Sequence, residues 1–258
     1  MSKGSRNRQQ AREKIAQMRA EEARGRRRRY WLTGTGVVAV IAAAAVGITL
    51  AVGGGSPQAG TSTPQLKLAS LSTLGNLAPA PSPGSPGSEG VPVPQAPALA
   101  STATAATGQK VDGISCQTSE QTIFHIHAHL TIFVNGKARQ VPAGVGIPGA
   151  RVQSSPQGPF ISTGTCFYWL HTHAPDGIIH IESPVQRTYT LGNFFDEWGQ
   201  PLSSGQVGPV KGHVTALYNG RVYQGNPRNI PLNAHAQIQL EVGTPHVAPE
   251  HISFPNGL

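Results

Sequence analysis

The clearest pattern in the chain is an alternation of apolar and polar side chains over residues 123–134, IFHIHAHLTIFV. Successive side chains of a β-strand point to opposite faces of a sheet, so this segment is predicted to be a strand. Its apolar face would carry Phe124, Ile126, Ala128, Leu130, Ile132 and Val134. Its polar face would carry His125, His127, His129 and Thr131. Asn135-Gly136 then favours a two-residue turn into a second strand over residues 137–141.

Similar patterns recur in the rest of this half of the chain. Residues 214–223 (VTALYNGRVY) again place Asn-Gly between two short strand-like runs, and residues 235–242 (HAQIQLEV) alternate. Residues 169–182 (WLHTHAPDGIIHIE) are predicted to form a hairpin around residues 175–177. Residues 191–198 show the helical spacing of aromatic side chains, with Thr190 as a candidate N-cap. The expected fold is therefore mainly β, an antiparallel sandwich or open barrel with one short helix.

An uninterrupted apolar run lies ahead of this domain. Residues 31–52 contain no charged side chain, and a helix of that length covers the roughly 30 Å hydrocarbon layer of a membrane. Four consecutive arginines, residues 26–29, adjoin the run, and basic residues beside a span stay on the cytoplasmic side. We therefore expect a single transmembrane helix over residues 30–52, a cytoplasmic N-terminus and an extracytoplasmic C-terminal domain. A cleaved signal peptide is the alternative, although the run exceeds the about 7–15 residues of a signal core.

The net charge of +8 belongs to the N-terminal tail. Residues 1–29 contain 11 of the 20 Lys/Arg and 3 of the 12 Asp/Glu, so the remaining residues carry nine of each and are neutral. This distribution argues against a basic nucleic-acid-binding domain. The expected partner is membrane lipid, through the anchor, and no protein partner is indicated.

Residues 53–110 are rich in Pro, Gly, Ser, Ala and Thr and poor in large apolar side chains. Such a segment cannot bury enough apolar surface to offset its chain entropy, so we expect a disordered stalk, followed by the β-rich domain over residues 111–258. Both cysteines, Cys116 and Cys166, lie in that domain. The expected topology places them in an oxidising compartment, which favours a disulfide between them.

All ten histidines follow residue 124. On the predicted strand His125, His127 and His129 share one face, about 7 Å apart along the chain, so neighbouring pairs could converge on one ion. A solvated polar face is the simpler alternative, because antiparallel sheets commonly have a wet side.

The predicted hairpin places a second group of ligands on one face. A loop over residues 174–177 sets His171 opposite His180, whereas a turn at Asp176-Gly177 alone sets His173 opposite His180. Either register gathers His171, His173, His180 and Glu182 without a nearby Lys or Arg, which favours a bound cation. The candidate metal ligands are therefore His125, His127, His129, His171, His173, His180 and Glu182.

The donor types limit which metal is expected. The methionines, Met1 and Met18, lie in the N-terminal tail and the cysteines are expected to be paired, so a soft copper(I) site lacks its usual ligands. Three histidines with water or a carboxylate suit zinc, and several imidazoles suit copper(II). We expect zinc first and copper second; two histidines with Glu182 would also suit iron(II) or manganese(II).

The segments HIHAHLTIFVNG, YWLHTHAPDGIIHIESP and LGNFFDEWG, over about residues 120–243, resemble a bacterial and archaeal family of uncharacterised, often membrane-anchored proteins with histidine-rich outer domains. The resemblance implies no established activity. The paired His-x-His is also similar to the zinc strand of alpha-type carbonic anhydrases, but the rest of that family's pattern is absent.

Three functions fit these features. The first is a membrane-anchored, extracytoplasmic metal-binding domain. The second is a metal-dependent hydrolase or lyase in which a histidine-bound ion activates water, with Glu182 as general base or ligand-orienting group. The third is a cell-surface interaction module without metal, whose histidines respond to pH.

Overall fold

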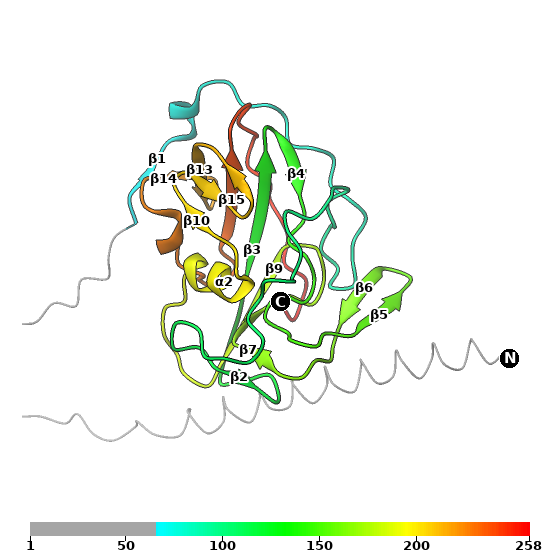
Figure 1. Cartoon of the computed structure of the whole chain (residues 1–258). Helices are drawn as coiled ribbons and strands as arrows, with labels where there is room; N and C mark the ends of the chain where they lie inside the picture. Colours follow the sequence, from blue (N-terminus) through cyan, green and yellow to red (C-terminus); the bar gives the residue numbers. More distant parts are fainter. Residues whose placement is uncertain (1–65) are drawn as a thin grey trace, which may run out of the picture. The chain divides into compact units, whose positions relative to one another are not determined.

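The computed structural model describes residues 66–258 (Figure 1). The predicted cytoplasmic tail, the predicted transmembrane helix and the first part of the predicted stalk lie outside these residues. Within residues 66–258, none of the helices has the length and apolar character needed to cross a membrane.

An eight-stranded sheet forms the centre of the domain. Its strands are β1 (Leu68–Ala69), β3 (Phe124–Val134), β4 (Lys137–Arg139), β8 (Leu170–His171), β9 (Ile178–Ser183), β13 (Val214–Tyr218), β14 (Arg221–Tyr223) and β15 (Gln237–Val242). They follow the order β1-β14-β13-β15-β3-β9-β8, with β4 also paired to β3. Neighbours run antiparallel except for β15 and β3, which run parallel. The expectation of a mainly β domain is confirmed.

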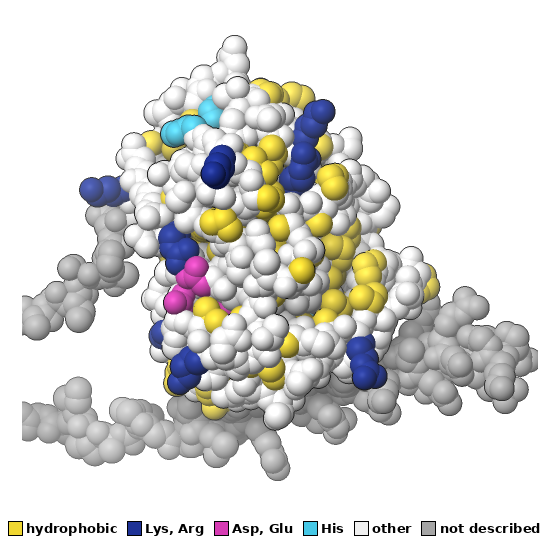
Figure 2. Space-filling view, viewed as in Figure 1, with side chains coloured by type: hydrophobic (Ala, Val, Ile, Leu, Met, Phe, Trp, Pro, Cys, Tyr) yellow, Lys and Arg dark blue, Asp and Glu magenta, His cyan; other side chains and the backbone are white. Residues whose placement is uncertain are grey.

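Three small sheets and three helical segments complete the described residues. The sheets are β2 (Cys116–Gln117) with β7 (Phe167–Tyr168), β5 (Val152–Ser155) with β6 (Gly158–Ile161), and β10 (Leu202–Ser203) with β11 (Gln206–Val207) and β12 (Val210–Lys211). The helical segments are the 3-10 turns η1 (Leu71–Leu74) and η2 (Pro227–Asn229) and the α-helix α2 (Leu191–Trp198). On the face shown in Figure 2, Lys and Arg side chains lie in several separate places rather than in one basic patch.

Both predicted Asn-Gly turns are present. Asn135 and Gly136 have φ angles of 49° and 72°, and Asn219 and Gly220 have φ angles of 49° and 73°. Positive φ at both central residues is the requirement of a tight hairpin turn that matches the twist of its strands. These turns set the pairing of β3 with β4 and of β13 with β14.

The predicted helix is also confirmed, over the expected residues. The Thr190 side chain accepts a hydrogen bond from the Asn193 backbone N–H, and the Asn193 side chain accepts one from the Thr190 backbone N–H. The helix ends at Gly199, whose φ of 67° lies in the left-handed region. Its aromatic side chains, at positions 194, 195 and 198, are fully buried.

The core lies on the α2 side of the sheet. The apolar face predicted for β3 is buried there, with the side chains at 128, 130, 132 and 134 in one cluster with Ile179 and Ile181 of β9 and the aromatic residues of α2. Because alternate positions of β3 and β9 enter this core, their histidines are directed to the opposite face.

The opposite face of the sheet is covered by two extended segments. Gln237 and Gln239 of β15 accept hydrogen bonds from the backbone N–H groups of Ile252 and Glu250 in the C-terminal segment. From the N-terminal side, residues 78–98, here called the strap, cross the same face, and a β-bridge joins Ala78 to Val247. A polar sheet face is therefore buried through side-chain to backbone hydrogen bonds.

The prediction of a disordered stalk is wrong for residues 66–110, which include the strap. Residues 66–110 belong to the domain, so its boundary lies ahead of residue 111, and the part of the stalk from 53 to 65 is outside the described residues. Val91 is fully buried and Leu99 nearly so, and β1 adds a strand to the sheet beside β14. The composition of this segment wrongly predicted disorder, because the segment packs on a sheet built by the rest of the chain and needs no core of its own.

The predicted disulfide between Cys116 and Cys166 is present, with the Cα atoms 5.5 Å apart. It lies beside the β2–β7 pair and fixes residues 116–117 next to the chain that enters β8. The disulfide therefore anchors the start of β3 and the strand that carries His171 to each other.

One buried carboxyl group of α2 leads to a stability prediction. Glu197 is fully buried, and within residues 66–258 neither of its carboxyl oxygens has a hydrogen-bond partner. Burial raises its pKa well above the usual range, so the folded state keeps a proton that the unfolded state loses. The stability that this proton provides is complete below the unfolded pKa of about 4.3 and is lost as the pH rises above it.

Glu197→Gln is uncharged at every pH and is therefore expected to be more stable than wild type at pH 7. The difference should disappear near pH 4, which urea denaturation at both pH values measures. A stability difference independent of pH would contradict the assignment.

Candidate metal centre

The two predicted histidine segments are neighbours in the sheet. β3 pairs with β9 so that His127 lies opposite His180 and His125 lies opposite Glu182. β8 pairs with β9 so that His171 lies opposite His180, which is the register with the longer loop. Three adjacent strands thus present their ligands on one face.

The first group of ligands, the β3 site, consists of His125, His127, His180 and Glu182. His127 Nε2 lies 3.1 Å from His125 Nε2 and 3.1 Å from His180 Nδ1. Glu182 Oε1 lies 3.1 Å from His125 Nε2 and 3.4 Å from His180 Nδ1. Four donor atoms therefore surround one point.

The second group, the β8 site, consists of His171, His173, His180 and Glu182, so it shares two residues with the β3 site. His171 Nε2 lies 3.2 Å from His173 Nε2 and 4.0 Å from Glu182 Oε2. Glu120 Oε1 lies 3.6 Å from His173 Nε2.

These separations match those of ligands on a single ion. Zinc binds imidazole nitrogen at about 2.0–2.1 Å in a tetrahedron, which places neighbouring ligand atoms about 3.3 Å apart. Four separations in the β3 site, from 3.1 to 3.4 Å, lie close to this value, and all its donor atoms lie within 4.8 Å of one another. Buried His and Glu side chains are thus grouped in a way that could hold a metal ion.

Hydrogen bonds determine which ring nitrogen of His171 and of His173 is available to bind a metal ion. His171 Nδ1 lies 2.9 Å from the Tyr168 carbonyl oxygen, and His173 Nδ1 contacts the Ile161 carbonyl oxygen. A carbonyl oxygen only accepts, so each Nδ1 carries the proton and each Nε2 presents a lone pair. Metal-binding histidines are oriented in the same way by a hydrogen bond from the second ring nitrogen.

His180 is oriented by a carboxylate instead. Its Nε2 lies 2.7 Å from Glu89 Oε1, so Nδ1 faces His127 and Glu182. The role of Glu89 was not predicted from the sequence, because Glu89 lies in the segment assigned to the stalk. A single glutamate among prolines and glycines offers no signal for this role.

Burial excludes the solvated polar face that the sequence left open. His127, His171, His173, His180 and Glu182 are each at most 6% exposed. The side chain of His125 is 31% exposed and that of Glu120 is 38% exposed, so the two sites are nearest to solvent at these residues.

Three of the histidines are held in the neutral form that binds metals. Burial, together with the neighbouring imidazoles, lowers the pKa of His127 to about 2 and that of His171 to about 3. The same causes lower the pKa of His173 to about 4. These rings are therefore uncharged at neutral pH, and in His171 and His173 the ligand nitrogen Nε2 carries no proton.

The pKa of His180 is shifted in the opposite direction from those of the other three rings. Burial lowers its pKa, but the charge of Glu89 and hydrogen bonds to Glu182 and Glu89 outweigh burial and raise the pKa to about 10. For Glu182, hydrogen bonds with His125 and His180 outweigh burial and keep the pKa well below the usual range. A metal ion at His180 Nδ1 would replace the proton that this ring otherwise shares with two carboxylates.

Removing the carboxylate that orients His180 should weaken metal binding. Glu89→Gln keeps the side-chain shape but removes the charge, and loss of such a ligand-orienting partner typically reduces metal affinity by about 10–100-fold. Isothermal titration of the full chain with Zn²⁺ measures the change. Glu250→Gln is the matched control, because Glu250 lies on the same face but contacts Thr131 rather than a ligand. Equal affinities for the two variants would contradict the role of Glu89.

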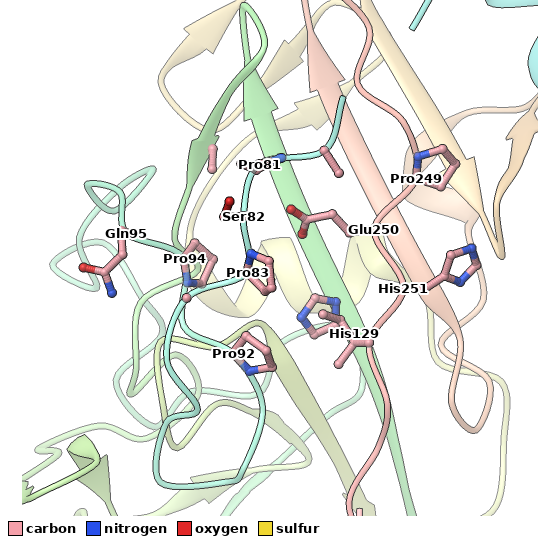
Figure 3. A pocket seen from close by; sticks show the side chains of 14 residues that line it. Pro81, Ser82, Pro83, Pro92, Pro94, Gln95, His129, Pro249, Glu250 and His251 are labelled. Carbon is pink, nitrogen blue, oxygen red and sulfur yellow. The ribbon is translucent and has the colours of Figure 1, made fainter. Parts of the chain in front are cut away.

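His129 does not join either group. Its Nε2 donates to the Asp176 carbonyl oxygen at 2.8 Å, and its Nδ1 lies 3.4 Å from Thr131 Oγ1. Instead it lines a cavity of about 330 Å³ between the strap and the C-terminal segment, beside Glu250 and several prolines (Figure 3). The structure thus brings together six of the seven predicted ligands and places the seventh outside both sites.

Searches of protein-family models, of curated proteins and of solved structures find no match to this chain.

Proposed function

We propose that this chain is a membrane-anchored, extracytoplasmic metal-binding protein that holds its ion between β3, β8 and β9. The observation that carries the proposal is the β3 site, in which three imidazole nitrogens and one carboxylate oxygen lie within 4.8 Å of one another and successive donors are 3.1–3.4 Å apart. Because His127, His180 and Glu182 are buried and Glu89 orients His180, little rearrangement of these three ligands is needed to bind an ion.

Zinc is the proposed ion, with copper(II) second. The donors are imidazole nitrogens and carboxylate oxygens, which suit both ions, and three histidines with one carboxylate make a common zinc ligand set. Both cysteines are consumed by the disulfide. The methionines lie in the N-terminal tail, so neither sulfur ligand supports a copper(I) site.

The proposed location rests on the apolar run at residues 31–52 and the arginines that precede it. The disulfide supports an oxidising compartment for the domain, since such bonds are rare in reducing cytosol. Protease added to intact cells or spheroplasts should then cleave the domain, and full protection would overturn the orientation.

Binding is favoured over catalysis. Neither of the two described cavities is lined by a residue of the β3 site or the β8 site. A hydrolase or lyase needs a substrate pocket that reaches the metal-bound water, so a metal-dependent enzyme is the second candidate. A metal-free interaction module whose histidines respond to pH fits least well, because burial holds the pKa values of His127, His171 and His173 far below neutral pH.

The test uses His180 and Glu182, which are common to both sites. The full chain, purified in detergent and stripped of metal, is titrated with Zn²⁺ and with Cu²⁺, and native protein is submitted to elemental analysis. We expect a Kd tighter than about 10 μM, equivalent to about −7 kcal/mol, and loss of stoichiometric binding in His180→Gln/Glu182→Gln.

His213→Ala removes an exposed histidine outside the two sites and should bind as wild type does. Circular dichroism and the thiol count compare the folds of the variants. A wild-type chain that binds neither ion at 10 μM would end the proposal.

A further inference from the structure

We infer that the centre holds two metal ions at once, one in the β3 site and one in the β8 site, with the Glu182 carboxylate bridging them through its two oxygens. This inference rests on the proposed function and deepens it. The described residues provide five imidazole rings and Glu182 at the centre, which is more than one tetrahedral ion can bind.

The two oxygens of Glu182 face different sets of histidines. Oε1 contacts His125 Nε2 and His180 Nδ1 at 3.1 and 3.4 Å. Oε2 lies 4.0 Å from His171 Nε2, is buried, and has no hydrogen-bond partner within residues 66–258. A buried carboxylate oxygen without a partner is costly, and an ion on the β8 side would satisfy it.

The β8 site has its own unexplained feature. His171 and His173 each use the Nδ1 proton for a backbone carbonyl, so their Nε2 lone pairs face each other at 3.2 Å with no proton between them. Two lone pairs at this distance repel each other unless a cation lies between them. The separation is close to the about 3.3 Å expected for two ligands of one tetrahedral zinc ion.

One ion cannot satisfy both sets. His125 and His127 belong to the β3 site, while His171 and His173 belong to the β8 site, and the two groups have only His180 and Glu182 in common. His180 directs Nε2 to Glu89, so its Nδ1, which lies 3.1 Å from His127 Nε2, serves the β3 site when an ion replaces its proton.

The second ion would therefore take three protein ligands, from His171, His173 and Glu182. Glu120 or solvent would complete its shell on the exposed side, since Glu120 Oε1 lies 3.6 Å from His173 Nε2. Carboxylate-bridged pairs of this kind hold their ions about 3.5–4 Å apart.

The number of ions per chain tests the inference. The full chain is loaded with Zn²⁺, freed of excess metal and analysed for its metal-to-protein ratio by mass spectrometry. We expect two ions for wild type, two for His213→Ala, and one each for His171→Ala/His173→Ala and His125→Ala/His127→Ala. Retention of one ion by each double variant shows that the fold survives the substitutions.

A wild-type ratio of one overturns the second ion but leaves the proposed function intact, whereas a ratio of zero overturns both. Two ions retained in His171→Ala/His173→Ala would also overturn the β8 site.

Electron paramagnetic resonance of the chain loaded with two Cu²⁺ tests the bridge directly. Ions 3.5–4 Å apart through one carboxylate should couple, which reduces the integrated signal below that of two isolated Cu²⁺ ions. The two double variants, with one Cu²⁺ each, should give the full signal of one isolated ion. Two bound but uncoupled Cu²⁺ ions in wild type would overturn the bridge.

Discussion

Saturating the full chain with Zn²⁺ is expected to raise its Tm by about 8–16 °C. An ion that binds the folded state and is present at about 1,000 times its Kd adds about 4.1 kcal/mol to stability. For a chain of this size each kcal/mol raises the Tm by about 2–4 °C. The β3 site joins His127 to His180, 53 residues later, so the unfolded chain does not hold these ligands together.

Scanning calorimetry of the metal-free and the metal-loaded chain measures this difference. His180→Gln/Glu182→Gln should lose the rise, because it removes ligands from both sites, and His213→Ala should keep it. Addition of EDTA to the loaded protein should return the Tm to the metal-free value. A Tm that Zn²⁺ leaves unchanged, in a chain shown to be folded, would contradict a buried metal centre.

Removal of the disulfide is expected to cost about 4 kcal/mol. The bond between Cys116 and Cys166 spans 50 residues, and closing a loop of that length lowers the entropy of the unfolded chain by a corresponding amount in the chain-entropy model. Cys116→Ser/Cys166→Ser should therefore unfold at a lower urea concentration than wild type.

The same experiment with a reducing agent provides the control. Reduction should destabilise wild type by a similar amount and leave the double variant unchanged, because the variant has no disulfide to lose. A difference below about 1 kcal/mol between variant and wild type would mean that the bond does not constrain the unfolded state.

Local sequence patterns predicted the elements that depend on neighbouring residues. The alternation on β3 identified both its core face and its ligand face, and the two Asn-Gly pairs identified the hairpin turns. The helix over residues 191–198 could be predicted because its aromatic side chains have helical spacing and Thr190 supplies the N-cap. In each case the decisive interactions lie within a few positions along the chain.

The sequence could not decide how these elements meet. Two registers of the hairpin were equally acceptable, and the choice depends on the pairing of β8 with β9 and on the backbone carbonyl groups that receive Nδ1 of His171 and His173. His129 follows the same alternation as His127, yet a single backbone oxygen, that of Asp176, occupies its Nε2. Such partners carry no signature in the side-chain pattern.

The amino-acid composition of the strap led to a wrong prediction of disorder for a related reason. It measures whether a segment can form its own core, whereas residues 78–98 pack on other parts of the chain, among them His180 of β9 and Val247 of the C-terminal segment. Glu89 can be recognised as a site residue only from the structure, in which the strap lies beside His180.

The strap also bears on how fast an ion could exchange with its surroundings. Glu89 holds His180 from a segment that contacts the rest of the domain through β-bridges, hydrogen bonds such as Gln140 to the Pro94 carbonyl, and the buried Val91. Segments held in this way open more often than the central strands of a sheet. The rate at which the strap opens would then limit the rate at which an ion dissociates. Two proteins with equal metal affinity but different straps would therefore differ in the residence time of the metal.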